Sequence, residues 1–258
     1  MASEISKTQI DRLGDRLRES DITEADLRLL DEYRRSFSEA YEFVVSGIRD
    51  ELGLEPTGRP AKSTTSISEK LLRESIRLTQ MQDIAGCRLV VSEIANQERV
   101  VTSLTKLFPQ APVVDRRARP SHGYRAVHVI VILGNKPVEI QVRTALQHVW
   151  AELSEKLADV VDPAIKYGGG SEATAKVLLE ASTTIAQHET QEIALAKLES
   201  QVSAMLLEER LEKEKEEGLI SLRLEIKATQ ESQISIRENT VMSLRRIIEQ
   251  IPLIGGEQ

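Results

Sequence analysis

Three polar side chains occupy alternate positions in an otherwise apolar segment of this sequence. They are Glu139, Gln141 and Arg143, and they follow a turn signal at Gly134-Asn135. Residues at positions i, i+2 and i+4 of a β-strand project from the same face. The pattern therefore predicts a carboxylate, an amide and a guanidinium on one strand face, where burial is costly without a binding partner. We expect a ligand site there.

The segment just upstream begins with a glycine turn and continues as an apolar run. Gly123-Tyr124-Arg125 leads into residues 127–131, where valine recurs at every second position, a pattern that predicts a largely buried strand. Tyr124 would offer an aromatic face on which a nucleobase can stack; a half-buried tyrosine at a strand edge is the simpler interpretation. His128, inside this strand, is by type more often a core histidine than a catalytic one.

Cations cluster beside this turn in a chain that is acidic overall. The net charge of −7 over 258 residues argues against a surface that coats nucleic acid generally. Most charge runs are solvated loops, but a polyanion that bound this chain would need a local basic patch. The residues that could form such a patch are Arg116, Arg117, Arg119 and Arg125.

A third group of candidates lies in residues 59–70. Arg59 and Lys62 precede Ser66, where a helix is expected to begin, and Lys70 follows one turn later. Cations near a helix N-terminus suit a polyphosphate, because the first-turn N–H groups and the helix dipole also favour anions. A solvated helix start is the simpler interpretation of this segment taken alone.

Asp83 stands just before a predicted strand, Cys87 to Val91, and Gly86 between them would allow another backbone segment to approach closely. Its carboxylate is a candidate Mg²⁺ ligand, although Asp83 could equally cap a turn. Paired with Glu139, it could hold one Mg²⁺ that neutralises phosphate charge. Glu139 could also accept the proton of an attacking hydroxyl.

In this order the motifs closely resemble the RelA/SpoT-type alarmone synthetase domain, from roughly Arg59 to Lys166. The resemblance implies an α+β fold, with a nucleotidyltransferase-like mixed β-sheet flanked by helices. It also implies a GTP diphosphokinase, a pyrophosphokinase that moves the β,γ-diphosphate of ATP to the 3′-hydroxyl of GDP or GTP and makes (p)ppGpp.

The resemblance implies a role for each candidate residue. Glu139 would be catalytic by activating the 3′-hydroxyl, and it would bind Mg²⁺ together with Asp83. Tyr124 would stack on the acceptor base. The residues that would bind ATP are Arg59, Lys62, Ser66, Lys70 and Arg88. The residues that would bind the acceptor are Arg117, Arg119, Tyr124, Arg125, His128, Gln141 and Arg143.

The chain departs from the family pattern at two points near the acceptor residues. Family members that make alarmones usually carry a lysine and an asparagine just before the Gly-Tyr pair, where this chain has Pro120-Ser121-His122. Many small synthetases have an acid followed by a histidine on the next helix, where this chain has residues 150–156. These departures concern guanine recognition and acceptor-phosphate contacts.

Two alternative functions stay open beside the GTP diphosphokinase. Some synthetase-only relatives are toxins that pyrophosphorylate the 3′ end of tRNA, and arginines beside an acceptor pocket would attract an RNA backbone. A non-catalytic nucleotide-sensing module is the third interpretation, and it would be favoured if either carboxylate were missing. Because Asp83 and Glu139 are both present, the enzymatic interpretations come first.

The flanking segments are expected to be helical. Residues 1–58 would form an N-terminal helical segment, with Thr23 as an N-cap; residues 59–167 would form the synthetase domain. Glycines at 168–170 mark a hinge, and residues 171–258 would form a charge-rich, coiled-coil-like extension with a bend at Gly218. We expect a homo-oligomer, or a partner protein bound, through these C-terminal helices.

Composition sets the remaining expectations. Aromatic residues make up 3% and charged residues 29%, which suits a modest core with long charged helices. Cys87 is the only cysteine, so an intramolecular disulfide and a cysteine-based zinc site are excluded. No segment is apolar and long enough to span a bilayer, so we expect a cytoplasmic protein with no membrane partner. We also expect a synthetase-only protein, because the N-terminal helices are too short for a histidine-aspartate hydrolase domain and lack histidine.

Overall fold

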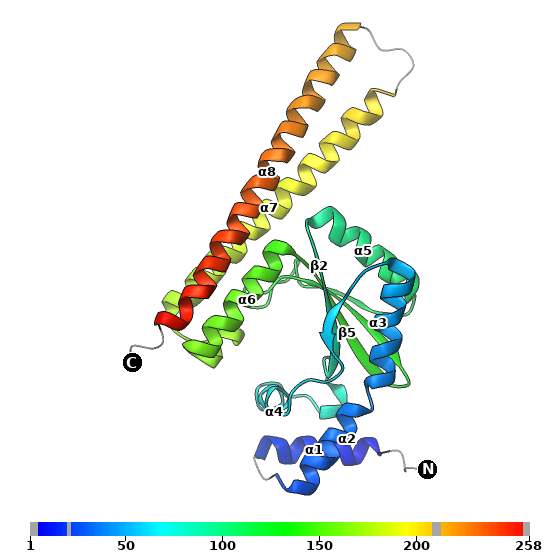
Figure 1. The fold of residues 1–258 in the computed structure, drawn as a ribbon, viewed down its shortest axis with the longest axis vertical. Coiled ribbons are helices and arrows are strands. Elements are labelled where there is room, and N and C mark those ends of the chain that lie inside the picture. Colours follow the sequence, from blue (N-terminus) through cyan, green and yellow to red (C-terminus); the bar gives the residue numbers. More distant parts are fainter. Residues whose placement is uncertain (1–4, 20–21, 208–212, 255–258) are drawn as a thin grey trace. The chain divides into compact units, whose positions relative to one another are not determined.

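The computed structural model describes residues 5–19, 22–207 and 213–254, and Figure 1 shows their helices and strands. The chain divides into two compact units. The first comprises Met1–Leu89, Val101–Val114 and Val127–Val142. The second comprises Val90–Val100, Asp115–Ala126 and Arg143–Gln258. The opening residues 1–4 lie outside the described part of the chain, and the expected domain boundaries stay a prediction.

The first unit begins with three consecutive helices, α1 (Lys7–Glu19), α2 (Glu24–Arg35) and α3 (Ser38–Leu52). The N-cap predicted at Thr23 is confirmed: its hydroxyl accepts the Asp26 N–H at 3.2 Å, and the Asp26 carboxylate accepts the Thr23 N–H at 3.1 Å. Helix α3 ends at Gly53, whose φ of 63° lies in the left-handed region that favours glycine.

A five-stranded sheet, counted over the described residues, forms the centre of the first unit, in the order β1-β2-β5-β4-β3. The strand bounds are β1 Thr57–Arg59, β2 Ala85–Val91, β3 Val113–Asp115, β4 Val127–Leu133 and β5 Lys136–Thr144. Strands β4 and β5, which the alternating residues predicted, pair with each other in antiparallel orientation. The mixed sheet flanked by helices confirms the predicted α+β fold class.

Two predicted element boundaries in this unit are corrected. Helix α4 (Thr64–Arg73) begins two residues before Ser66, because the Ser63 hydroxyl accepts the Ser66 N–H and caps the first turn. Strand β2 begins at Ala85 rather than Cys87, because pairing with β1 extends to Gly86. The core includes the buried side chains Phe37, Ile48, Ile67 and Leu78 from the helical segments, and Val129 and Ile140 from the sheet.

The second unit is mostly helical. It contains the start of α5 (Ile94–Leu107), then α6 (Ala145–Val160), the short 3₁₀ helix η2 (Pro163–Tyr167), α7 (Glu172–Met205) and α8 (Lys213–Ile254). Helix α8 packs on α6 and on α7. The apolar cluster between these helices includes Leu146, Trp150, Leu153, Ile185 and Ile251.

The C-terminal helices confirm a helical extension but correct one detail. The bend predicted at Gly218 is wrong, because Gly218 lies within α8; an exposed helical glycine costs only about 1 kcal/mol relative to alanine. The charge run at 208–217 lies outside the described residues over 208–212, and Lys213, Lys215, Glu216 and Glu217 are exposed. Among the described residues, the structure has no helix that is both apolar enough and long enough to cross a membrane.

Candidate active site

Glu139 lies on β5 in the first unit, and two neighbouring side chains hold its carboxylate. The Gln141 amide donates a hydrogen bond to Oε2 at 2.6 Å, which confirms that the two side chains share a strand face. From β4, the His128 ring nitrogen Nδ1 lies 2.9 Å from Oε1. His128 is paired in register with Gln141, so its ring reaches Glu139 diagonally across the two strands.

These contacts keep Glu139 ionised. Burial raises the pKa of the Glu139 carboxyl, and the charge of Asp83 acts in the same direction, but the hydrogen bonds from His128 and Gln141 together lower the pKa below its ordinary value. A buried carboxylate that is ionised at neutral pH can accept a proton from a hydroxyl placed beside it.

Asp83 is held by both lysines that the sequence assigned to phosphate binding. Lys62 Nζ lies 2.7 Å from Oδ2, and Lys70 Nζ lies 2.9 Å from Oδ1. Burial raises the pKa of Asp83, but the two ammonium groups outweigh it and lower the pKa to about 2. The predicted metal ligand and the predicted phosphate ligands therefore form one charged cluster, with Lys70 presented by α4.

The other candidate ATP residues lie on the same unit. Arg59 is exposed at the end of β1, and Arg88 is half-buried on β2. Ser66 belongs to the cap of α4, where its hydroxyl accepts a hydrogen bond from the Ser63 hydroxyl at 2.8 Å. Gly86 allows the close approach that the sequence predicted, since an added Cβ would lie 2.9 Å from the Glu139 carbonyl oxygen.

The residues present fit a magnesium ion bound mainly through a substrate. Asp83 is close enough to Glu139 for its charge to raise the pKa of the Glu139 carboxyl. Among the described residues, three or more histidine, cysteine or acidic side chains do not gather anywhere in a metal-binding group. Mg²⁺ typically takes one or two carboxylates and completes its shell with phosphate oxygens and water. A pair of carboxylates next to Lys62 and Lys70 matches that donor set.

The acceptor candidates Tyr124 and Arg143 belong to the second unit. The buried Arg143 guanidinium donates to the Tyr124 hydroxyl at 3.0 Å and lies 5.0 Å from the centroid of its ring. Tyr124 is half-buried and packs against the apolar cluster of α6, α7 and α8. Its ring is thus held in one orientation by a cation and by apolar contacts.

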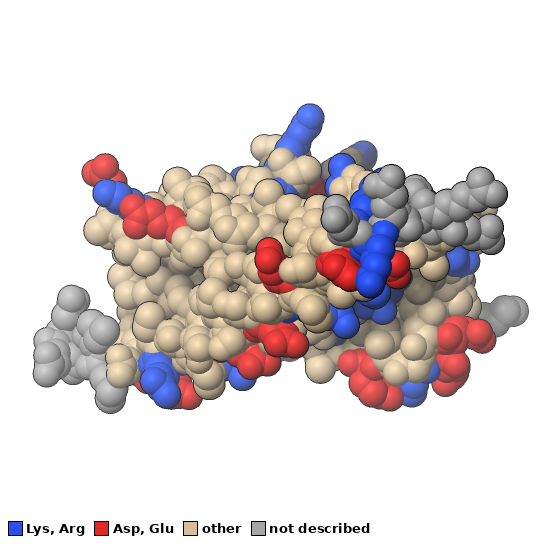
Figure 2. Space-filling view, turned by 90° about the horizontal axis from the view of Figure 1, so that it is seen from above, with Lys and Arg blue, Asp and Glu red and all other residues tan. Residues whose placement is uncertain are grey.

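The arginine cluster differs from the expected basic patch. Arg117 pairs with Asp115 at 2.6 Å and with Glu98 at 2.7 Å, and Arg125 forms a buried ion pair with Glu189 of α7. Carboxylates thus engage both guanidinium groups, and the predicted role of Arg117 and Arg125 in acceptor binding stays a prediction. Arg119 is exposed, as is its neighbour Arg116. On the face drawn in Figure 2, basic and acidic side chains of the described residues lie interspersed.

Sequence reasoning missed Glu189 and the glutamines that accompany it. Gln97 and Gln147 are fully buried and hydrogen-bonded to each other at 2.8 Å, and Gln147 also donates to Glu189 at 2.6 Å. All three stand in helical segments whose periodicity predicts only a helix. The signal that could have marked Glu189 is weak: it is a glutamate in a helical stripe with Leu178, Ser182 and Ile185.

One family pattern matches the chain, that of a region found in RelA / SpoT proteins, over residues 58–158. The predicted resemblance is thereby confirmed for this part of the chain. The RelA/SpoT region contains Asp83, Tyr124 and Glu139, whereas Glu189 lies outside it.

Several curated proteins are similar to this chain in sequence. An uncharacterized protein of Mycobacterium tuberculosis (strain ATCC 25618 / H37Rv) is 35% identical over 147 residues, which cover 51% of this chain and 54% of that protein. The probable GTP diphosphokinase RSH3, chloroplastic, of Oryza sativa subsp. japonica is 36% identical over 95 residues, or 35% of this chain and 13% of that protein. The chain thus spans about half the length of the first of these relatives.

Solved structures are also similar. The crystal structure of the small alarmone synthetase 1 from Bacillus subtilis has 27% sequence identity, covers 69% of this chain and 99% of its own, and has a TM-score of 0.48. A second structure of that synthetase, bound to its product pppGpp, has 26% identity, the same coverage and a TM-score of 0.49.

Proposed function

We propose that this protein is an ATP-dependent pyrophosphokinase that transfers the β,γ-diphosphate of ATP to the 3′-hydroxyl of GDP or GTP, producing (p)ppGpp. The observation that carries the proposal is the ionised Glu139 carboxylate, held by His128 and Gln141 within a RelA/SpoT region. The name of the rice relative, a probable GTP diphosphokinase, supports the same enzyme class.

In the proposed reaction, Glu139 accepts the proton of the 3′-hydroxyl as its oxygen attacks the β-phosphorus of ATP. A bond forms between that oxygen and the β-phosphorus, the bond from the β-phosphorus to the α-phosphate oxygen breaks, and AMP leaves. Magnesium held by Asp83 and Glu139 would neutralise phosphate charge. Lys62 and Lys70 would bind the same phosphates. Both ammonium groups contact the Asp83 carboxylate and therefore lie close together.

The remaining candidates divide between the two nucleotides. Arg59, Arg88 and Ser66 would contact ATP, and Tyr124, oriented by Arg143, would stack on the acceptor base. The exposed Arg119 would contact acceptor phosphates. Arg117 and Arg125 would affect acceptor binding by holding the loop in place rather than by contacting the acceptor. Carboxylates already pair with their guanidinium groups.

The 3′ end of tRNA is the second candidate acceptor. The observation that favours it is the pair of exposed arginines, Arg116 and Arg119, next to a loop in which Pro120-Ser121-His122 replaces the residues usual in alarmone synthetases. Two exposed cations give a weak electrostatic attraction for RNA, and a salt-dependent acceptor KM would accompany tRNA binding.

The deciding experiment uses γ-labelled ATP and Mg²⁺, with GDP, GTP and deacylated tRNA offered in parallel. We expect label in the guanine nucleotides. Glu139→Gln should reduce transfer by about 10²–10⁴-fold, while the Kd for ATP stays within about threefold, because the amide keeps the shape of the carboxyl but does not accept the proton. Glu42→Gln, an exposed position on α3, is the matched control. Label only in tRNA would establish the second candidate, and label in no acceptor would refute the enzymatic proposal.

We also propose that α7 and α8 mediate self-assembly. Large apolar side chains are exposed along both helices, including Leu179, Ile193, Leu224 and Met242, and Leu224 is 63% exposed. Exposed apolar side chains in this number on two long helices favour association with another apolar surface.

A further inference from the structure

A buried polar network in the second unit joins α7 to the loop that carries Tyr124. The Arg125 guanidinium donates from Nε to Glu189 Oε2 at 3.1 Å, and the other Glu189 oxygen accepts from Gln147 at 2.6 Å. Gln147 in turn accepts from Gln97 at 2.8 Å. The side chains of Arg125 and Glu189 are 11% and 7% exposed, so the charge pair is nearly excluded from water.

Helix α7 contacts the same loop at a second point, two turns earlier. The Ser182 hydroxyl donates to the Gly123 carbonyl oxygen at 2.7 Å, and Trp150 Nε1 donates to the Leu178 carbonyl oxygen at 2.8 Å. A Cβ at Gly123 would lie 2.8 Å from the Trp150 ring. One face of α7 therefore holds the backbone of Gly123 and, through Glu189, the side chain two residues later.

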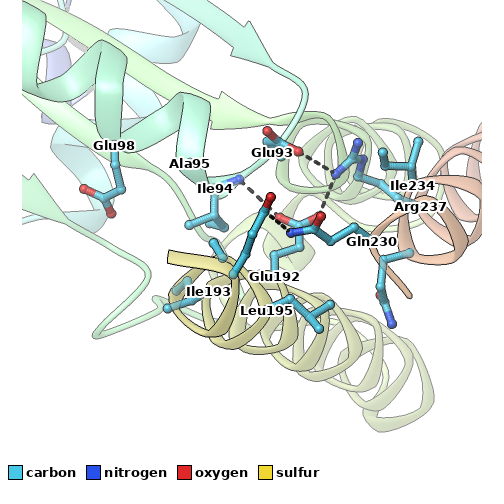
Figure 3. Close-up of a pocket in the computed structure, with 13 residues that line it drawn as sticks. Glu93, Ile94, Ala95, Glu98, Glu192, Ile193, Leu195, Gln230, Ile234 and Arg237 are labelled. Atoms are coloured by element: carbon cyan, nitrogen blue, oxygen red, sulfur yellow. Dashed lines mark hydrogen bonds and ion pairs between the residues drawn. The ribbon is translucent and has the colours of Figure 1, made fainter. Parts of the chain in front are cut away.

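Helix α7 is itself clamped one turn beyond Glu189. Glu192 accepts the N–H of Ile94, the first residue of α5, at 3.2 Å, and so satisfies a donor that has no partner within its helix. Arg237 of α8 donates to the same carboxylate at 2.7 Å and lies 3.6 Å from Glu93. Figure 3 shows Glu192 between Ile94 and Arg237 at the edge of a cavity. These contacts fix the position of α7 along its axis, and its rotation about that axis, next to Glu189.

We propose that Glu189 is a positioning residue for the acceptor loop, residues 115–126. By holding Arg125, it sets where the neighbouring Tyr124 presents its ring, so that a helix outside the RelA/SpoT region forms a structural part of the acceptor site. The identity of the acceptor rests on the proposed function, but the positioning of the loop by Glu189 does not.

The physical reason is the cost of an unpaired buried charge. Without the Glu189 carboxylate, the Arg125 guanidinium either stays buried and unpaired or moves towards water. A movement of Arg125 towards water displaces the loop. Asparagine or glutamine amides cannot replace the ionic contact, although Glu189→Gln keeps an oxygen for the hydrogen bond. The loss should therefore be graded, with Glu189→Ala more severe than Glu189→Gln.

The test combines hydrogen–deuterium exchange with steady-state kinetics on the full chain. Glu189→Ala, Glu189→Gln and Arg125→Ala are compared with Glu180→Ala, a control on the same helix whose side chain is 67% exposed. We expect faster exchange in residues 115–126 for the first three variants. We also expect an acceptor KM at least tenfold higher for Glu189→Ala, with the KM for ATP within twofold and the control unchanged.

A third readout needs no activity. Trp150 is the only tryptophan, and its ring contacts Gly123 of the loop, so acrylamide quenching of its fluorescence reports loop displacement. Unchanged exchange in residues 115–126 and unchanged quenching in folded Glu189→Ala would overturn the proposal, as would equal KM increases for ATP and acceptor. If the unsubstituted protein transfers no label, the proposed function fails, and the exchange and quenching results still decide the role of Glu189.

Discussion

His128 Nδ1 and Glu139 Oε1 lie 2.9 Å apart across the β4–β5 pair, and both side chains are about seven-eighths buried, with exposed fractions of 12% and 13%. Sequence reasoning placed His128 among the acceptor ligands and Glu139 as the base. The distance couples them directly, because the ring nitrogen contacts the carboxylate that would take the proton. His128 thus influences the ionisation of Glu139.

The first prediction concerns the pH dependence of transfer. Because the pKa of Glu139 is lowered, its carboxylate stays ionised at mildly acidic pH, and activity should fall only as the pH drops through that lowered pKa. His128→Ala removes a group that lowers the pKa, whereas burial and Asp83 still raise it. The acidic limb of the kcat profile should therefore move to higher pH. An acidic limb at the same pH in both proteins would contradict the coupling.

The second prediction concerns stability at low pH. Asp83 has a pKa of about 2 in the folded protein against an ordinary value of 3.8. A carboxyl with a lowered folded pKa contributes stability above its unfolded pKa, and this contribution is lost as the pH falls from about 4 to about 2. The shift corresponds to roughly 2 kcal/mol. Urea unfolding of Asp83→Asn should show about this loss at pH 7.

The same variant supplies its own control. Because the contribution of Asp83 disappears on protonation, the difference in unfolding free energy between Asp83→Asn and the unsubstituted protein should shrink towards zero near pH 2. Lys62 and Lys70 then lack a charged partner in both proteins. A difference that is equal at pH 7 and near pH 2 would show that the variant acts through packing instead.

The third prediction compares two glycines. Gly123 has a φ of 88°, and an added Cβ would lie 2.8 Å from the Trp150 ring, so Gly123→Ala should destabilise the protein by about 1–3 kcal/mol. Gly218 lies in α8 with nothing within 4 Å of an added Cβ, so Gly218→Ala should stabilise α8 by roughly 0.5–1 kcal/mol. Thermal unfolding followed by circular dichroism measures both. Equal shifts in Tm would refute the constraint at Gly123.

The fourth prediction tests assembly through the C-terminal helices. Leu224→Lys places a charge where a 63% exposed leucine now stands, and it should lower the mass measured by light scattering if α8 lies in an interface between copies. Ile132→Lys on β4 is the matched control, since Ile132 is 61% exposed but lies away from α7 and α8 in the sequence. An equal mass for all three proteins would exclude Leu224 from the interface.

The sequence by itself determined several elements of the first unit. Alternating valines predicted β4, residues two apart predicted the shared face of Glu139 and Gln141, and the Thr23 cap predicted the start of α2. These predictions succeed because strand alternation and helix capping depend on residues near one another in the chain. The order of the motifs also predicted the resemblance to RelA/SpoT proteins, whose family pattern matches residues 58–158.

Tertiary structure alone decided the partners of the charged residues. Arg125 contacts Glu189, which lies 64 positions later in the sequence. Lys62, just before α4, and Lys70, within α4, both contact Asp83, which lies just before β2. In the sequence, a run of arginines predicts a basic patch. In the folded chain, carboxylates pair with Arg117 and Arg125 of that run. Long-range ion pairs depend on which elements pack together, and local periodicity carries no information about that choice.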